Sequence, residues 1–463
     1  MQNDNRFLGT EPVGKLLFKL ALPAVAAQLI NMLYNIVDRI YIGHMPGDGD
    51  LALTGVGICL PIILFISAFA CLISAGGAPR ASIAMGRGDM DTSEKILGTC
   101  LTLQIILSVG LTAVLLLWNR ELLLLFGGSE NTIGYAVEYM NVYAIGTIFV
   151  QLTLGMNAYI TAQGFAQTSM LTVLIGAICN IILDPIFIFG LGLGVQGAAL
   201  ATVISQGISC CWVMAFLLGK KTLWRIRREN LRLRWKLLTP CLALGLSPFI
   251  MQSSESVIFV CFNSSLLNYG GDVAVGAMTI LTSVMQFALL PLQGLGQGAQ
   301  PITSFNFGAG NAQRVKKTVF LLLKVSLAYA LVLWLLVLFF PGLFAGMFTP
   351  DQELLAFSSR VLPIYCGALV IFGIQTGCQL TFVAIGYAKS SILVAVMRKF
   401  VLLLPLIYLM PRLVENKTIG VYMAEPVADI LAVIFTVILF SVQFKKALRS
   451  MGEPLEGRVR DSC

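Results

Sequence analysis

Acidic side chains stand inside two long apolar segments of this sequence. Asp38 lies late in the first segment, in NMLYNIVDRIYIG, and Asp184 lies late in the fifth, in CNIILDPIFIFG. An ionisable side chain at membrane depth costs at least about 2.5–3.5 kcal/mol, so such residues usually serve a function. Asn180 precedes Asp184 by four residues and shares its helix face, and Thr202 lies early in the sixth segment. If successive helices alternate in direction, the four side chains reach one level and can converge.

This set of side chains has the chemistry of a site for a small monovalent cation. Two neighbouring carboxylates in a medium of low dielectric cannot easily both stay ionised, so one is expected to carry a proton. Two carboxylates, an amide carbonyl and a hydroxyl would also suit Na⁺. A structural interpretation remains open, in which Asp38 pairs with Arg39 at the interface and Asp184 caps a helix break at Pro185.

A second group of ionisable residues lies in the second half of the sequence. Glu255 is early in the seventh apolar segment, and Arg398 and Lys399 are near the middle of the eleventh. They predict either a second site or a buried Glu–Arg ion pair. Glu425 and Asp429 are early in the twelfth segment, where solvation at the membrane boundary and a place in a cavity are both open.

Composition shows which elements must hold these residues. The chain of 463 residues is 57% hydrophobic and only 12% charged, against roughly 25% charged in soluble domains. A spanning helix needs about 20 mostly apolar residues. Twelve such segments are predicted, near 15–42, 51–80, 93–118, 133–160, 167–190, 195–218, 238–268, 273–304, 315–340, 353–384, 389–410 and 419–444. The fold class is therefore an all-α integral membrane protein.

The distribution of basic residues predicts the orientation in the membrane. With a cytoplasmic N-terminus, 23 Lys and Arg lie on the inner side and five on the outer side, as the positive-inside rule requires. Both termini are then cytoplasmic, in a multi-pass protein of the cytoplasmic (inner) membrane. The polar first fourteen residues resemble no cleavable signal peptide, so the first helix is expected to act as an uncleaved anchor.

The net charge of +8 does not indicate nucleic-acid binding, because the basic residues cluster in short connectors beside apolar runs, where anionic lipid and topogenesis explain them. The eleven cysteines are scattered without a CxxC pair and are expected to be buried thiols. A single histidine, His44, excludes a histidine-rich metal site.

The chain repeats itself after 222 residues. GGAPRASIAMGRG at 76–88 aligns with GAQPITSFNFGAG at 298–310, and the same shift pairs Tyr143 with Tyr365 and Gly164 with Gly386. A duplication of six helices inserts both halves the same way round, so two lobes related by a pseudo-two-fold axis along the membrane normal are predicted. The predicted units are the N-lobe 1–218, a basic cytoplasmic linker 219–237, the C-lobe 238–444 and a cytoplasmic tail 445–463.

A cleft between the lobes is the expected place for a substrate. Soft, aromatic or polar side chains are candidates for its lining, with packing in the core as the alternative: Met32, Tyr34, Asn35, Met156, Asn157, Met278, Met285 and Phe287. Pro23, inside the first helix, favours a kink that is either static or changes when Asp38 changes charge. The acid pair has no counterpart at the shifted positions, so coupling is expected to differ between the lobes.

The chain resembles the multidrug and toxic compound extrusion (MATE) family over nearly its whole length. The resemblance is carried by LPAVAAQLINMLYNIVDRIYIG (22–43), GGAPRASIAMGRG (76–88), MNAYITAQGFAQTSM (156–170), CNIILDPIFIFGLGLGVQGAALAT (179–202) and IGVYMAEPVADI (419–430). The chain looks most like the bacterial MepA-like branch.

The resemblance implies a twelve-helix, two-lobed exporter with a cation site in the N-lobe. The family's positions for this cation site correspond to Asp38, Asn180, Asp184 and Thr202, and the family's helix-one proline corresponds to Pro23. Some members carry a second cation site with a helix-seven Glu and a helix-ten Asp. Glu255 fits the first position, but helix ten here has Gln375 and Gln379 and no Asp within the membrane, which puts a complete second site of that kind in doubt.

The expected function is antiport, in which H⁺ or Na⁺ at the acid pair exchanges for amphipathic, often cationic organic molecules by alternating access. The expected partners are the lipid bilayer and these small substrates, and no nucleic acid. The protein is expected to be a monomer, with no cofactor besides the coupling ion. The alternative is a lipid-linked precursor flippase of the same broad fold. Only Arg398 and Lys399 support it, as cations that could hold a diphosphate. An intramembrane enzyme lacks a catalytic constellation such as HExxH, and a channel lacks a repeated filter sequence.

Overall fold

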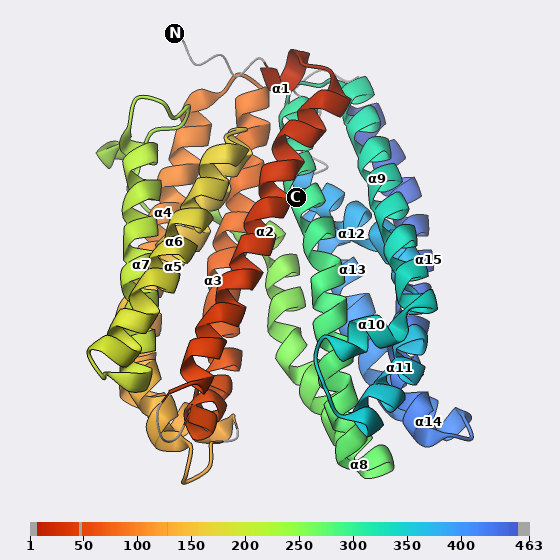
Figure 1. The fold of residues 1–463 in the computed structure, drawn as a ribbon. Coiled ribbons are helices and arrows are strands. Elements are labelled where there is room, and N and C mark those ends of the chain that lie inside the picture. Colours follow the sequence, from red (N-terminus) through yellow and green to blue (C-terminus); the bar gives the residue numbers. More distant parts are fainter. Residues whose placement is uncertain (1–6, 46–48, 127, 452–463) are drawn as a thin grey trace.

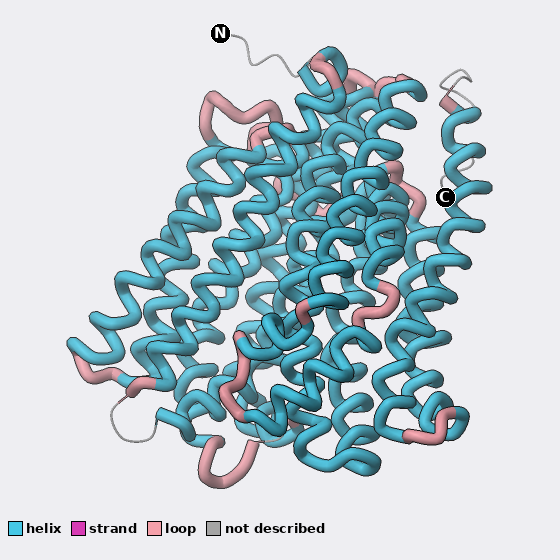
Figure 2. Tube along the Cα trace, turned by 45° about the vertical axis from the view of Figure 1, so that its right-hand side comes forward, coloured by secondary structure: helices cyan, strands magenta, loops and turns pink. Residues whose placement is uncertain are grey.

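The computed structural model describes residues 7–45, 49–126 and 128–451, and within them every regular element is a helix (Figure 2). The N-lobe elements are α1 (Phe7–Thr10), α2 (Val13–Gly43), α3 (Gly49–Gly86), α4 (Met90–Leu125), α5 (Ile133–Ala162), α6 (Ala166–Pro185), the π-helical η1 (Ile186–Gly190) and α7 (Gly194–Leu218). The short 3-10 helix η2 (Arg228–Asn230) lies in the connector.

The second half begins with α8 (Trp235–Gly308). It continues with α9 (Ala312–Phe339), α10 (Pro341–Gly346), α11 (Gln352–Tyr365), α12 (Leu369–Ala384), α13 (Ala388–Val396), the π-helical η3 (Met397–Leu403), α14 (Leu404–Leu413) and α15 (Lys417–Ser450). α15 thus ends six residues beyond the predicted span, and the described part of the predicted tail is helical as far as Ser450. The rest of that tail, from residue 452, lies outside the described residues.

These helices account for the twelve predicted spans. Within the described ranges, ten helices are long and apolar enough to cross a membrane. One of them, α8, is two helices that meet at Gly271, whose φ of 66° and ψ of −162° are not helical. A further span is formed by α11 and α12, which are bent by 53° relative to each other. The bend and the two π-helical segments were not predicted, because hydropathy measures only length and apolarity.

The two lobes meet through a reciprocal contact that reflects the duplication. A Cβ added to Gly86 of α3 would lie 2.0 Å from the backbone oxygen of Phe305 in α8, and a Cβ added to Gly308 of α8 would lie 2.0 Å from the backbone oxygen of Ile83 in α3. Gly86 and Gly308 are 222 positions apart, and so are Ile83 and Phe305. Such exchange of equivalent residues across an interface is the signature of a two-fold relation, so the structure confirms the pseudo-symmetric architecture.

The turns after α3 and α8 repeat in the same register. Gly88 and Gly310 both have positive φ, 82° and 75°, which glycine adopts at little steric cost. Each is followed by a helix N-cap side chain: Asp89 accepts a hydrogen bond from the Thr92 amide, and Asn311 accepts one from the Arg314 amide. These caps satisfy donors that the first helical turn leaves free.

Among the described residues, the lobes share a hydrophobic cluster only at the end at which α2 begins, called here the N-terminal end. One hydrophobic cluster there contains residues of both lobes, such as Leu17, Ile73, Cys241 and Ala299. Towards the other end, called the far end, each lobe has its own cluster. Figure 1 shows the corresponding shape, with the helices of the two lobes packed together near α1 and diverging towards the far end.

Candidate functional site

Three helices of the N-lobe bring the predicted cation-site residues together. α2 carries Asp38, α6 carries Asn180 and Asp184, and α7 carries Thr202. The Asn180 side-chain amide donates to Asp184 Oδ1 at 3.2 Å and to Thr202 Oγ1 at 3.4 Å. Asp38 approaches Asp184 so closely that the two carboxyl groups can share a hydrogen bond when one of them carries a proton. The four side chains therefore form one cluster.

The cluster is buried and contains oxygen atoms without a partner. Asp184 and Asn180 are fully buried, and Asp38 is partly accessible. Asp38 Oδ1, Asn180 Oδ1 and Asp184 Oδ2 have no hydrogen-bond partner within the described part of the chain. Leaving a buried polar atom unpaired is costly, particularly when it bears charge. Two neighbouring carboxylates with free oxygens therefore suit a small cation, either H⁺ or Na⁺.

The two structural explanations for these acids fit the site less well. Arg39 is exposed and adds only its charge to the surroundings of Asp38. At Pro185 the chain continues from α6 into η1 without leaving a helical path. Asp184 is held by Asn180 within its own helix, four residues away.

Tyrosines surround the cluster, and two of them were not predicted. Tyr34 of α2 was expected in the cleft, and the charges of both Asp38 and Asp184 act on it. Tyr139 of α5 lies within hydrogen-bonding reach of Thr202, and its ring stacks on that of Tyr143 with centroids 6.0 Å apart. The only signal in the sequence was the match of Tyr143 to Tyr365 in the repeat.

The other candidates for the cleft lining divide into buried and accessible residues. Met156, Met278 and Met285 lie inside hydrophobic clusters, so in this arrangement of the lobes they pack in the core, which was the alternative for these residues. They fill the core because flexible methionine side chains adapt to irregular gaps. Asn35 and Phe287 are exposed, and Met32 and Asn157 are partly buried, the latter donating to the Ser169 carbonyl at 3.3 Å.

Pro23 lies where α2 meets the opposite lobe. α2 remains one continuous helix across this proline. A Cβ added to Gly294 of α8 would lie 2.6 Å from Cα of Val25, and one added to Gly298 would lie 2.4 Å from Cα of Ala21. The weakest point of the α2 hydrogen-bond ladder therefore coincides with its closest approach to the C-lobe.

The charged residues of the C-lobe pair differently from the prediction. Glu255 of α8 pairs with Lys399 at 2.6 Å instead of with Arg398. Arg398 pairs with Asp429 at 2.7 Å and with Glu425 at 3.1 Å, both on α15. Gln375 of α12 is buried, and neither its Nε2 nor its Oε1 has a partner within the described residues.

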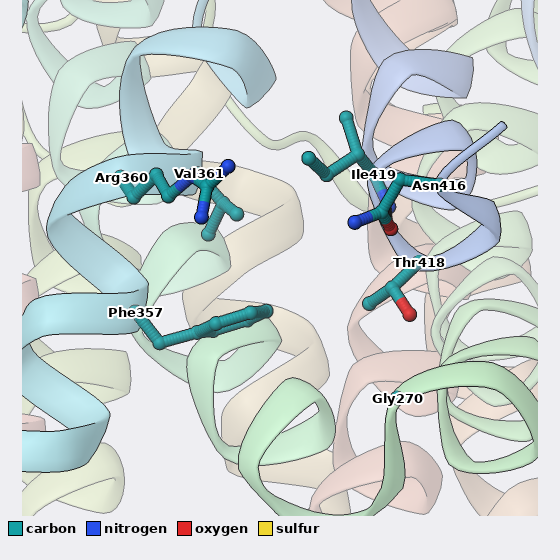
Figure 3. A pocket seen from close by; sticks show the side chains of 7 residues that line it. All are labelled: Gly270, Phe357, Arg360, Val361, Asn416, Thr418 and Ile419. Atoms are coloured by element: carbon teal, nitrogen blue, oxygen red, sulfur yellow. Dashed lines mark hydrogen bonds between the residues drawn. The ribbon is translucent and has the colours of Figure 1, made fainter. Parts of the chain in front are cut away.

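A separate hollow of about 250 Å³ lies near the far end of the C-lobe. Figure 3 shows Phe357, Arg360 and Val361 of α11 on one side and Asn416, Thr418 and Ile419 on the other, with Gly270 of α8 below. None of the acids discussed above lines it. The hollow is therefore not part of the candidate cation site.

Comparison with known proteins identifies the family. The MatE family model matches residues 23–186 and 248–409, one stretch in each lobe. The multidrug export protein MepA of Staphylococcus haemolyticus is 26% identical over 78% of this chain and 79% of its own. The FAD transporter of Shewanella oneidensis is 27% identical over 92% of this chain and 94% of its own.

Solved structures show the same fold. The crystal structure of MATE in the bent conformation superposes with a TM-score of 0.91, at 22% identity, over 98% of this chain and 100% of that chain. The described helices include enough apolar spans for a multi-pass membrane protein. The chain therefore belongs to the MatE family, the multidrug and toxic compound extrusion transporters, and has MepA-like relatives.

Proposed function

We propose that this protein is a secondary antiporter that exports amphipathic, often cationic organic molecules in exchange for H⁺ or Na⁺. The observation that carries the proposal is the buried pair Asp38 and Asp184, whose free oxygens adjoin Asn180 and Thr202 within a MatE-family chain. Export of drugs is the activity named for the MepA relatives. The coupling ion and alternating access are proposed from the chemistry of the acid pair and the joining of the lobes at one end.

Cation binding is proposed to act on the lobes through α2. This helix carries Asp38 in its second half, packs against α6 of the same lobe, and touches α8 of the other lobe around Pro23. When a cation neutralises the acid pair, the repulsion between the carboxylates disappears and α2 can move closer to α6. A change in the path of α2 at Pro23 then alters its contact with Gly294 and Gly298 and favours one lobe arrangement.

Positively charged substrates are favoured by the charges of the C-lobe. Glu255 has a side chain that is 54% exposed, whereas its partner Lys399 is 3% exposed and Arg398 is 5% exposed. An accessible carboxylate beside buried, paired cations attracts cationic molecules more readily than anionic ones. The FAD transporter among the relatives makes a dinucleotide the second candidate substrate. A dinucleotide and a lipid diphosphate are anionic and would require accessible cations, whereas Lys399 and Arg398 are buried.

Transport into and out of proteoliposomes tests this proposal. Purified protein is reconstituted, a gradient of H⁺ or of Na⁺ is imposed, and movement of a cationic dye is compared with movement of FAD. We expect dye movement that depends on one of the two gradients, and loss of that dependence in Asp38→Asn and in Asp184→Asn. The matched control is Asp89→Asn, which keeps a good N-cap residue outside the membrane.

The outcomes separate the candidates. FAD movement without dye movement would replace the drug substrate by the dinucleotide while keeping the coupling site. Gradient-dependent transport that persists unchanged in both aspartate variants would remove the acid pair from the mechanism.

A further inference from the structure

Five ionisable side chains form a connected cluster inside the C-lobe. Lys399 Nζ lies 2.6 Å from Glu255 Oε1, while Arg398 Nε lies 2.7 Å from Asp429 Oδ1 and Arg398 Nη2 lies 3.1 Å from Glu425 Oε1. All but Glu255 are buried. The guanidinium of Arg398 also lies 4.5 Å from the centroid of the Phe372 ring. The cluster thus joins α8, η3 and α15 under an apolar cover from α12.

The charges of this cluster do not balance when every group is ionised. Lys399 and Glu255 form a pair of one cation and one anion. Arg398 instead serves two carboxylates, Glu425 and Asp429, which are four residues apart on one face of α15. One negative charge is therefore left over, in a region where an uncompensated buried charge costs several kcal/mol.

A free oxygen marks the place of the excess charge. Asp429 is buried, and its Oδ2 has no hydrogen-bond partner within the described residues, although Oδ1 is bound to Arg398. The other polar side chains that act on this site are Tyr365 at the end of α11 and Cys366 directly after it. Neither of them carries a positive charge. A cation from solution is thus the remaining means of neutralising the pair.

The cluster lies on helices that correspond to those of the N-lobe acid site. The shift of 222 residues relates Tyr143, which neighbours Tyr34 and Tyr139 of the N-lobe site, to Tyr365 beside Glu425, Glu255 and Asp429. It relates Thr202 to Ala424, the neighbour of Glu425, and it relates Leu33, the neighbour of Tyr34, to Glu255. Asp38 and Asp184 themselves correspond to Val260 and Leu406, so the acid pair has no counterpart at the shifted positions, and the C-lobe acids lie at other positions of the equivalent helices.

We propose that the carboxyl pair Glu425 and Asp429 is a second protonation site, which binds one proton beside the fixed cation Arg398. The proton neutralises the charge that Arg398 cannot balance alone. The C-lobe site thus differs from the N-lobe site, because two built-in cations already hold three carboxylates in place and leave capacity for a single H⁺. This inference goes beyond the proposed antiport, since it concerns proton binding whatever substrate is carried.

Infrared spectroscopy of the protein in lipid nanodiscs tests the proposal, because the carbonyl stretch of a protonated carboxyl differs from that of a carboxylate. The background is Asp38→Asn with Asp184→Asn, which removes the N-lobe acids. In near-neutral buffer exposed carboxyl groups are ionised, so we expect one protonated carboxyl per molecule to remain. Adding either Asp429→Asn or Glu425→Gln should remove it, because Arg398 then balances the remaining carboxylate.

The loss in both single variants distinguishes a shared proton from an ordinary buried acid, which only one variant would affect. Glu94→Gln is the matched control, since Glu94 pairs one-to-one with Arg227 outside the membrane and its loss should leave the signal unchanged. Thermal unfolding provides the second readout: each single variant should stay folded, whereas Glu425→Gln combined with Asp429→Asn leaves Arg398 buried and unpaired and should lower the melting temperature.

Three results would overturn the proposal. The first is the absence of any protonated carboxyl in the background protein. The second is a signal that survives in both Asp429→Asn and Glu425→Gln. The third is a signal that disappears when Na⁺ is added at constant pH, which would assign the pair to Na⁺ instead. Because the N-lobe acids are absent from the background, none of these results bears on the proposed transport activity.

Discussion

The amide of Asn180 organises the N-lobe site at the level of single residues. Its hydrogen bond to Asp184 lies within α6, and its hydrogen bond to Thr202 links α6 to α7. Its own Oδ1 has no partner in the described part of the chain and is open to a ligand. We therefore expect Thr202 to act chiefly by orienting Asn180, and through it the carboxyl of Asp184.

Replacing Thr202 by valine tests this role. Thr202→Val keeps the shape but removes the hydroxyl that accepts from Asn180, at a cost of about 1 kcal/mol for one hydrogen bond. We expect the affinity for the coupling cation to fall roughly fivefold, measured as the cation concentration at half-maximal transport. Thr172→Val is the control, because it removes a threonine hydrogen bond on α6 away from the acids. Equal losses in both variants would contradict a specific role for Thr202.

The residues of the N-lobe site were predictable, whereas their surroundings were not. Rare charges in apolar helices and the four-residue spacing of Asn180 and Asp184 led directly to the cluster. Tyr139 carries no comparable signal, because a tyrosine in an apolar helix is ordinary. The partners of Arg398 and Lys399 depend on η3, since a π-helical turn changes the direction of both side chains and no simple sequence pattern reveals it.

At the scale of elements, α1 connects the two lobes at the N-terminal end. The side chain of Arg314, at the start of α9, donates to the carbonyls of Leu8 and Glu11 at 3.1 and 2.8 Å. On the N-lobe side a Cβ on Gly164 would lie 2.5 Å from the Phe7 ring. The short helix therefore rests on both lobes and is held in place by charge-assisted hydrogen bonds.

Arg314→Met should weaken this connection. Hydrogen bonds from a charged donor contribute about 1.5–3 kcal/mol, so the population of lobes joined at this end should fall about tenfold or more relative to the alternative. Fluorescence energy transfer between labels on the two lobes measures that population. Lys317→Met removes an exposed charge from the same helix and should have no effect. An unchanged population in Arg314→Met would show that α1 does not hold the lobes together.

Helix existence was predictable, but helix shape was not. Twelve apolar segments appear in both sequence and structure, because the bilayer dictates their length. The bend between α11 and α12 and the length of α15 depend on packing against neighbouring helices. The extension of α15 to Ser450 includes Lys445 and Lys446, which hydropathy places outside the membrane although they remain helical.

For the whole molecule, the duplication predicts that equivalent residues of the interface matter equally. Gly86→Ala and Gly308→Ala each place a methyl group against a backbone carbonyl, and each should destabilise the joined N-terminal end by about 1–3 kcal/mol. The two variants should shift the interlobe distance by similar amounts. Gly110→Ala is the control, because nothing lies within 4 Å of its added Cβ. A large difference between the first two variants would argue against the pseudo-two-fold contact.

The repeat in the sequence predicted two related lobes, but it did not predict at which end the lobes are joined. That depends on small energy differences between packings of the same helices. The family match in both lobes is consistent with the duplication.

We propose that occupancy of the pair Asp38 and Asp184 governs which way the lobes face. The most direct measurement is the distance between labels at Ser129 and Glu353, on different lobes, while H⁺ or Na⁺ is added. We expect one of these cations to shift the distance distribution of the wild-type protein, and we expect no such shift in Asp38→Asn with Asp184→Asn. The same cation-dependent shift in that double variant would contradict it.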